Sequence, residues 1–203
     1  MAKVKGKKKI GSTDMTAMCD VAFLLLTFFI LTATAKPPEV MHVDTPQSTV
    51  QTKLPEKDLA TLTVGSKKVF FDVKGKNVRL KTLELMGEKY EIVFTDQEKQ
   101  TFASMESFGV PIESMKQILA MSNSERKDAN QPGIPMDSLN NQLAEWIQNA
   151  RLANMELQEA DLSIAIKGDA KEEYPVIRKV MDVLQDQKIN SFSLVTGLRT
   201  KDF

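Results

Sequence analysis

A single carboxylate lies within the longest apolar stretch of the chain, and its surroundings point most directly to chemistry. Asp20 is the only charged residue between Met15 and Ala35. A carboxylate inside a hydrocarbon layer costs about 3 kcal/mol on insertion scales. Because a low-dielectric environment favours the neutral form, such a group can bind and release a proton. Asp20 is therefore the candidate proton-binding residue.

Three threonines share one face with Asp20 if this stretch is helical. At 100° per residue, Thr16, Thr27 and Thr34 fall within about 40° of it and of one another. A polar stripe of this kind prefers a protein surface or a hydrated cavity to lipid. The alternative is that threonine hydroxyls bond to carbonyls of their own helix and that the alignment is accidental.

The apolar stretch itself predicts one transmembrane helix, residues 15–35. These 21 residues would form a helix about 32 Å long, close to a hydrocarbon core of about 30 Å. Lys36-Pro37-Pro38 ends it, because proline removes a backbone donor and clashes with the preceding turn. Five lysines in the first ten residues make residues 1–14 a basic N-terminus that stays in the cytoplasm by the positive-inside rule.

Other interpretations of the same residues stay open. A basic start, the apolar run Val21–Leu31 and the small-x-small pattern Ala33-Thr34-Ala35 also describe a secretory signal peptide, which would remove residues 1–35. Asp20 could instead cap a shorter helix that begins at Val21, or its carboxylate could reach the cytoplasmic interface.

Composition excludes several classes of protein and site. The chain has 203 residues, of which 42% are hydrophobic and 27% charged, so most of it can fold around a core. The 27 basic and 27 acidic residues cancel, so global basicity does not indicate nucleic acid binding. One cysteine and one histidine, His42, exclude a disulfide framework and a Cys-rich or multi-His metal site. No phosphate loop or nucleophile elbow occurs, and we expect no enzyme, metal or cofactor.

The rest of the chain predicts a linker and one α+β domain with helices on one face of a sheet. Residues 36–57 are rich in Pro, Ser, Thr and Gln and predict a semi-extended linker before the domain at 58–203. The expected elements are a hairpin of Leu59–Val64 and Lys68–Val73, a helix at Pro111–Met121, a loop at Ser122–Pro135, a helix capped by Asp137 or Ser138 that contains Trp146, and a strand–helix–strand unit from Leu162 to Thr196 with parallel strands. Residues 78–98 mix strand and helix signals.

Two segments resemble the ExbD/TolR family. Asp14-Met-Thr-Ala-Met-Cys-Asp20-Val and the apolar run after it are similar to the family's N-terminal pattern, although Ala17 stands where proline is usual. Residues 162–169, 174–184 and 189–196 resemble the family's strand–helix–strand end. Residues of about 75–135 find no counterpart in compact members and are expected to be an insertion.

The resemblance implies a single-pass protein of the bacterial inner membrane with a periplasmic domain. It implies a proton-driven energy transducer in which a dimer of this chain lies inside a ring of ExbB/TolQ-like multi-span partners. Asp20 would then carry the proton, and a TonB-like periplasmic protein would receive the motion and power outer-membrane transport. A TolR-like subunit of the Tol–Pal envelope system is the alternative. A secreted or anchored periplasmic binding domain without proton coupling is another.

Overall fold

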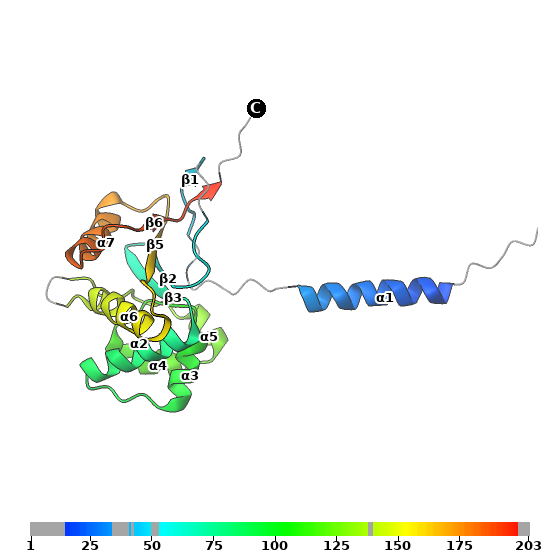
Figure 1. Cartoon of the computed structure of the whole chain (residues 1–203), viewed down its shortest axis with the longest axis horizontal. Coiled ribbons are helices and arrows are strands. Elements are labelled where there is room, and N and C mark those ends of the chain that lie inside the picture. Colours follow the sequence, from blue (N-terminus) through cyan, green and yellow to red (C-terminus); the bar gives the residue numbers. More distant parts are fainter. Residues whose placement is uncertain (1–14, 34–40, 42, 50–52, 138–139, 199–203) are drawn as a thin grey trace, which may run out of the picture. The chain divides into compact units, whose positions relative to one another are not determined.

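The computed structural model describes residues 15–33, 41, 43–49, 53–137 and 140–198. They belong to two units, 1–37 and 38–203, which are described separately. The first unit contains one helix, α1 (Met15–Thr32), and the second contains the mixed helix-and-sheet domain labelled in Figure 1. The expected fold class, an N-terminal apolar helix followed by an α+β domain, is confirmed.

The domain is built on a five-stranded sheet in the order β4-β3-β2-β5-β6. Its strands are β2 (Leu59–Gly65), β3 (Lys68–Val73), β4 (Ser107–Phe108), β5 (Ser163–Gly168) and β6 (Ser193–Leu194). β2 and β3 form the predicted antiparallel hairpin, and Ser66 and Lys67 have φ of 51° and 61° in its turn. Two positive φ values match the twist of a two-residue hairpin. β5 runs parallel to β6, as the strand–helix–strand prediction required, and it also runs parallel to β2, which was not predicted.

Seven helical segments complete the described part of the domain. They are α2 (Lys76–Lys89), α3 (Asp96–Ser104), the 3₁₀ turn η1 (Ile112–Ser114), α4 (Met115–Ala120), α5 (Asn123–Asp128), α6 (Gln142–Gln158) and α7 (Tyr174–Asp186). α2 and α6 pack side by side (Figure 1). The predicted helix at 111–121 is present as η1 followed by α4, and residues 78–98, which had no clear pattern, contain most of α2 and the start of α3.

The main core lies between the helices and one face of the sheet. Alternate residues of the central strands, such as Leu62, Phe71 and Ile166, are at most 1% exposed and point the same way because side chains alternate along a strand. Trp146 on α6 is completely buried, and its ring stacks on Phe102 of α3 at 5.9 Å. Trp146 is thus a core residue, as the sequence pattern indicated.

Two sequence predictions for residues 122–141 were wrong. Residues 122–135 are not all loop, because α5 occupies 123–128 and begins with a capping box of Ser122 and Glu125. The helix that contains Trp146 is capped neither by Asp137 nor by Ser138. Its N-cap is Asn141, whose side-chain oxygen accepts a hydrogen bond from the backbone N–H of Ala144 at 3.1 Å. Asp137 forms an isolated antiparallel bridge with Asn140, and Ser138 lies outside the described residues.

The described part of the predicted linker includes a short strand. β1 (Gln47–Ser48) pairs in parallel with β7 (Gly197–Leu198) in a separate two-stranded sheet. Figure 1 shows β1 beside the last strand of the chain. Val43, just before β1, is 5% exposed. Residues 43–48 are therefore attached to the domain at its C-terminal end.

α3 offers a test of local helix capping. The Thr95 hydroxyl accepts the Glu98 N–H, and the Glu98 carboxylate accepts the N–H and hydroxyl of Thr95. This capping box lowers the pKa of Glu98 through its hydrogen bonds to Thr95. We expect Thr95→Ala to lower the free energy of unfolding by about 1 kcal/mol. Urea denaturation followed by Trp146 fluorescence measures this, with Thr95→Ser as the control that keeps the cap.

Candidate functional site

The candidate site lies on α1, whose composition suits a membrane environment. Its 18 residues have a mean hydropathy of 2.0, and none of them is buried within the chain. At 1.5 Å per residue the helix is about 27 Å long, slightly less than a hydrocarbon core. Length and composition therefore qualify α1 as a membrane span, although a signal sequence passes the same test.

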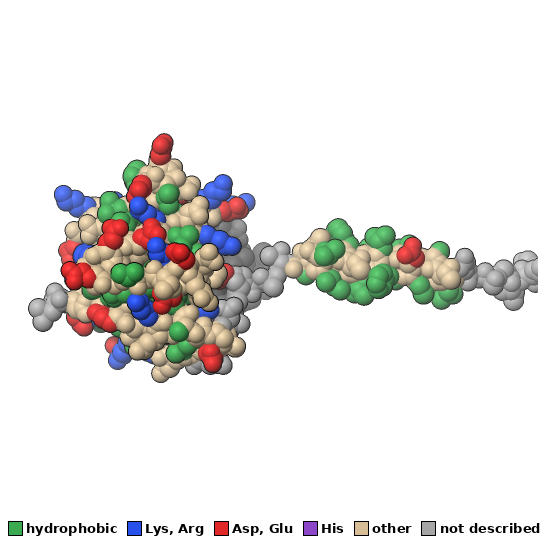
Figure 2. Space-filling view, turned by 90° about the horizontal axis from the view of Figure 1, so that it is seen from below, with side chains coloured by type: hydrophobic (Ala, Val, Ile, Leu, Met, Phe, Trp, Pro, Cys, Tyr) green, Lys and Arg blue, Asp and Glu red, His purple; other side chains and the backbone are tan. Residues whose placement is uncertain are grey.

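Asp20 lies in the second turn of α1, with its side chain exposed. Phe23 and Leu24, one helical turn after Asp20, are 66% and 62% exposed. The carboxylate therefore lies on a helix whose surface is otherwise largely apolar. Figure 2 shows the acidic side chain among the hydrophobic ones of this helix. Any apolar medium around α1 would surround Asp20 as well. The helix itself supplies no cationic side chain, because Asp20 is its one charged residue.

The threonine stripe is only partly described. Thr16 and Thr27 lie on α1 together with Asp20, whereas Thr34 lies outside the described residues. The Thr27 hydroxyl donates to the carbonyl of Leu24 at 2.9 Å, and Thr32 bonds in the same way to Phe28 at 2.8 Å. Own-helix bonding, the alternative interpretation of the stripe, therefore holds for Thr27. Its hydroxyl oxygen retains acceptor capacity towards a neighbouring helix.

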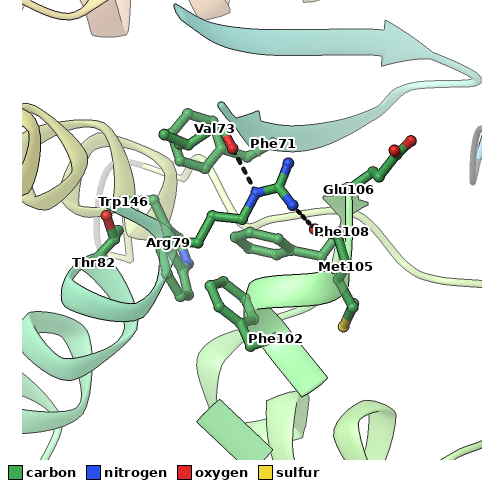
Figure 3. Close-up of a pocket in the computed structure, with 9 residues that line it drawn as sticks. All are labelled: Phe71, Val73, Arg79, Thr82, Phe102, Met105, Glu106, Phe108 and Trp146. Carbon is green, nitrogen blue, oxygen red and sulfur yellow. Dashed lines mark hydrogen bonds between the residues drawn. The ribbon is translucent and has the colours of Figure 1, made fainter. Parts of the chain in front are cut away.

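The domain contains a small aromatic cavity that could be taken for a second site. It is lined by Phe71, Phe102, Phe108 and Trp146 together with Arg79, whose side chain runs among these rings, and Glu106 (Figure 3). The free space inside is about 10 Å³, roughly the room for one water molecule. The cavity is therefore too small for a substrate, and its aromatic residues belong to the core described above.

Beside this cavity lies a largely buried ion pair between α2 and β3. Arg79 Nη2 lies 2.9 Å from Asp72 Oδ1, with the two side chains 13% and 15% exposed. The guanidinium also donates to the backbone carbonyls of Val73, Ala103 and Met105 (Figure 3 shows Val73 and Met105). It thereby joins the end of β3 to the C-terminal end of α3. These contacts occupy most of the donors of the guanidinium and leave few for a ligand.

The sequence analysis did not single out this pair. The signal in the sequence is weak. Asp72 is the one polar residue in the run Val69-Phe-Phe-Asp-Val73, and a polar residue at such a position in a strand usually faces solvent. Arg79 lies on α2, whose pattern is ambiguous. The two side chains come together only in the folded domain.

The ion pair leads to a pH-dependence prediction. Burial raises the pKa of Asp72, and the neighbouring charge of Arg79 only partly opposes this. A carboxyl group whose pKa is higher in the folded state holds its proton better when folded, so its contribution to stability falls as pH rises through and above its ordinary pKa. As pH rises from 3 to 6, we expect the free energy of unfolding of Asp72→Asn to fall less, relative to its value at pH 3, than that of the wild type. Urea unfolding followed by Trp146 fluorescence at each pH measures it, and an unchanged difference between the two proteins across this range would contradict it.

The remaining candidates give no site among the described residues. Within the described ranges, no group of three or more His, Cys, Asp or Glu side chains is arranged to hold a metal ion. Cys19 on α1 is a free, exposed thiol, and His42 lies outside the described residues. Asp20 therefore remains the best candidate for function.

Comparison with known proteins agrees with the arrangement of an apolar helix followed by this domain. No curated protein and no solved structure matches the chain significantly. The family model described as biopolymer transport protein ExbD/TolR matches residues 6–198, from the basic N-terminus to β7. Together with α1, this match indicates a single-pass membrane protein associated with transport. The chain belongs to the ExbD/TolR family of biopolymer transport proteins.

Proposed function

We propose that this chain is the ExbD-type subunit of a proton-driven energy transducer, and that Asp20 is its proton-binding residue. The observation that carries the proposal is the position of Asp20, the one charged side chain on an 18-residue apolar helix. A charged side chain in a membrane span is energetically costly and is therefore rare unless it has a function. Binding and release of a proton is a function that a carboxylate in this position can perform. Membership of a biopolymer transport family supports the same conclusion.

The physical cycle follows from the two protonation states of Asp20. The charged form requires a polar partner or water, and the neutral form can face a drier wall. One elementary charge that crosses 100 mV gains about 2.3 kcal/mol, which is enough to bias the exchange between two orientations of a helix. Repeated protonation and release would therefore rotate or shift α1, and the domain would transmit this motion.

The proposed topology places residues 1–14 in the cytoplasm and the domain in the periplasm, across the inner membrane. The lysines of the N-terminus support this orientation. On α1 the residues around Asp20 are largely apolar apart from the threonines, and no cationic side chain lies on the helix, so a charged Asp20 requires a polar surface from outside it. We propose that an ExbB/TolQ-like multi-span protein and a second copy of this chain provide it. A TonB-like periplasmic protein would receive the motion.

Retention of α1 is the first test of this topology. We expect the protein in carbonate-washed membranes to have the intact mass of the full chain. A soluble form that begins at Lys36 would instead identify residues 1–35 as a signal peptide and remove Asp20 from the mature protein. The proton-coupling step is then tested by Asp20→Asn in the assembled complex.

A further inference from the structure

An open groove lies on the surface of the domain, away from the aromatic cavity. The C-terminal half of α2, the loop at 91–94 and Lys99 of α3 line it. Its volume is about 550 Å³, within the range of about 300–1,000 Å³ that is usual for ligand pockets. All the residues that line it belong to the segment at 75–135, which the sequence analysis expects to be an insertion. This segment therefore has a surface feature of its own.

Backbone contacts fix the loop against the end of α2. The Ile92 N–H donates to the Gly87 carbonyl at 2.8 Å, just after Glu91 turns the chain back with a φ of 55°. A Cβ added at Gly87 would lie 2.7 Å from the Ile92 carbonyl oxygen. The absence of a side chain at Gly87 therefore lets the loop lie close to the helix, and the groove is held in shape by the backbone.

The loop presents one apolar side chain to the groove. Val93 is 82% exposed, more than any other large hydrophobic side chain in the described part of the domain. Its neighbours Ile92 and Phe94 pack on the core, so the loop is anchored on both sides of Val93. A single exposed hydrophobic residue is ordinary on a protein surface. Val93, however, lines the groove and can contact whatever lies in it.

The charges that line the groove are mainly negative. Glu84, Glu88 and Glu91 contribute three carboxylates, and Lys99 contributes one cation. Lys99 Nζ lies 2.8 Å from Glu84 Oε1, so these two charges cancel. Among the described residues, the carboxylates of Glu88 and Glu91 form no ion pair or hydrogen bond. The groove therefore combines two unpaired carboxylates with an exposed valine.

We propose that this groove binds a short segment of a partner protein in which a basic residue stands beside an apolar one. The basic group pairs with Glu88 and Glu91, and the apolar side chain covers Val93. Opposite charges on facing surfaces select the partner, whereas burial of apolar surface supplies affinity that exposed ion pairs alone do not give. A protein segment fits this groove better than a polyamine, which has no branched apolar side chain to cover Val93.

Fluorescence anisotropy on the full-length protein in phosphatidylcholine nanodiscs tests the proposal. The probe is a short labelled peptide of alternating lysine and valine, its control is a peptide of alternating glutamate and valine, and empty nanodiscs give the background. We expect saturable binding of the lysine peptide only. Binding should weaken as salt is raised, because salt screens exposed charges. No saturable binding up to about 1 mM peptide would overturn the proposal.

Variants of the groove assign the binding to its side chains. Glu88→Gln with Glu91→Gln should weaken binding about tenfold, and Val93→Ser about fivefold or more. Glu172→Gln with Glu173→Gln removes two acidic residues outside the groove and should leave the affinity unchanged. Urea unfolding of each variant checks that the domain is folded. Equal weakening by the two double variants would show general attraction between charges and would overturn the proposal.

A reversal of charge tests for a gain of binding. Glu88→Lys with Glu91→Lys should lose the lysine peptide and gain saturable binding of the glutamate peptide, which a damaged groove would not do. Failure of this exchange would overturn the proposal. So would displacement of the lysine peptide from the wild type by spermidine at the concentration at which the unlabelled peptide displaces it.

This inference goes beyond the proposed function and does not require proton transfer. Asp20 lies on α1 and the groove lies on the domain, so Asp20→Asn should bind the lysine peptide as well as the wild type does. If Asp20→Asn transports normally while the groove variants lose the peptide, the proposed function fails and this inference stands. If Asp20→Asn loses transport and the groove variants bind the peptide normally, the inference fails and proton coupling stands.

Discussion

Asp20→Asn is expected to abolish proton-driven work while the protein remains in the membrane and in its complex. Asparagine has nearly the shape of aspartic acid but cannot release a proton, so the charged half of the cycle is lost. Because the neutral amide is less costly in an apolar medium than a carboxylate, insertion of α1 should not suffer. We expect transport or growth that depends on the proton gradient to fall at least about a hundredfold, towards the level without the protein.

Matched variants make this result specific. Asp14→Asn changes an acidic residue before α1 and should leave transport unchanged. Asp20→Glu keeps an ionisable group and should retain partial activity if the longer side chain reaches the same partner. Co-purification with the multi-span partner, measured for each variant, separates lost assembly from lost proton transfer. Normal transport by Asp20→Asn would reject proton coupling at this residue and favour an anchored binding domain.

Arg79→Gln is expected to cause a large loss of stability in the domain. The substitution leaves the Asp72 carboxylate buried without its cation, and the carbonyls of Val73, Ala103 and Met105 lose their shared donor. Removal of one partner of a buried ion pair typically costs about 3–5 kcal/mol. The chain has one tryptophan, and it lies in the core of this domain. Denaturation followed by fluorescence therefore reports on the domain without a signal from α1.

The same helix provides the control for this prediction. Lys81 on α2 forms an ion pair with Glu156 at 3.1 Å, but that carboxylate is 58% exposed. We expect Lys81→Gln to change stability little, because exposed pairs are weak. The double variant Arg79→Gln with Asp72→Asn should recover part of the loss, because no buried charge remains unpaired. Equal effects of Arg79→Gln and Lys81→Gln would show that the buried pair has no special role.

Local patterns predicted those parts of the fold in which apolar residues recur with one clear period. The β2–β3 hairpin and β5 follow strand alternation, and α7 follows helical spacing. α2 was not recognised because a polar residue occupies one of its buried positions. Thr82 is 1% exposed, and its hydroxyl is satisfied by the Val78 carbonyl at 2.7 Å. Such a bond within the helix lets a polar residue lie in the core without showing the usual apolar period.

Two helix starts carry a recognisable signal in the sequence. Thr95-x-x-Glu98 and Ser122-x-x-Glu125 both match the capping-box pattern, and both form it in the structure. The prolines and glycine after Ser122 favoured a loop in the sequence analysis, yet α5 fits before them. The pairing of β1 with β7 carries no such local signal. Two short segments from opposite ends of the chain meet there, and neither alternates for long enough to be recognised.

The candidate site can be proposed from the sequence because its signal is chemical. A lone charge in an apolar helix is visible without coordinates, and the structure confirms the helix around Asp20. The contribution of Thr16 and Thr34 depends on neighbours outside this helix and stays a prediction. The expected insertion at 75–135 also stays a prediction. Its described residues include α2, α3 and β4, which supply the core positions Leu83, Phe102 and Phe108.

The order of strands has a consequence for how the domain is made. β2 pairs with β5, and Leu59 meets Ser163 about 100 residues further along the chain. A chain synthesised from its N-terminus at about 5–20 residues per second therefore completes the β2–β3 hairpin many seconds before β5 exists. During that interval one edge of β2 offers unpaired backbone groups, which attract other extended chains. Newly made protein should therefore depend on chaperones most strongly before residue 168 has emerged.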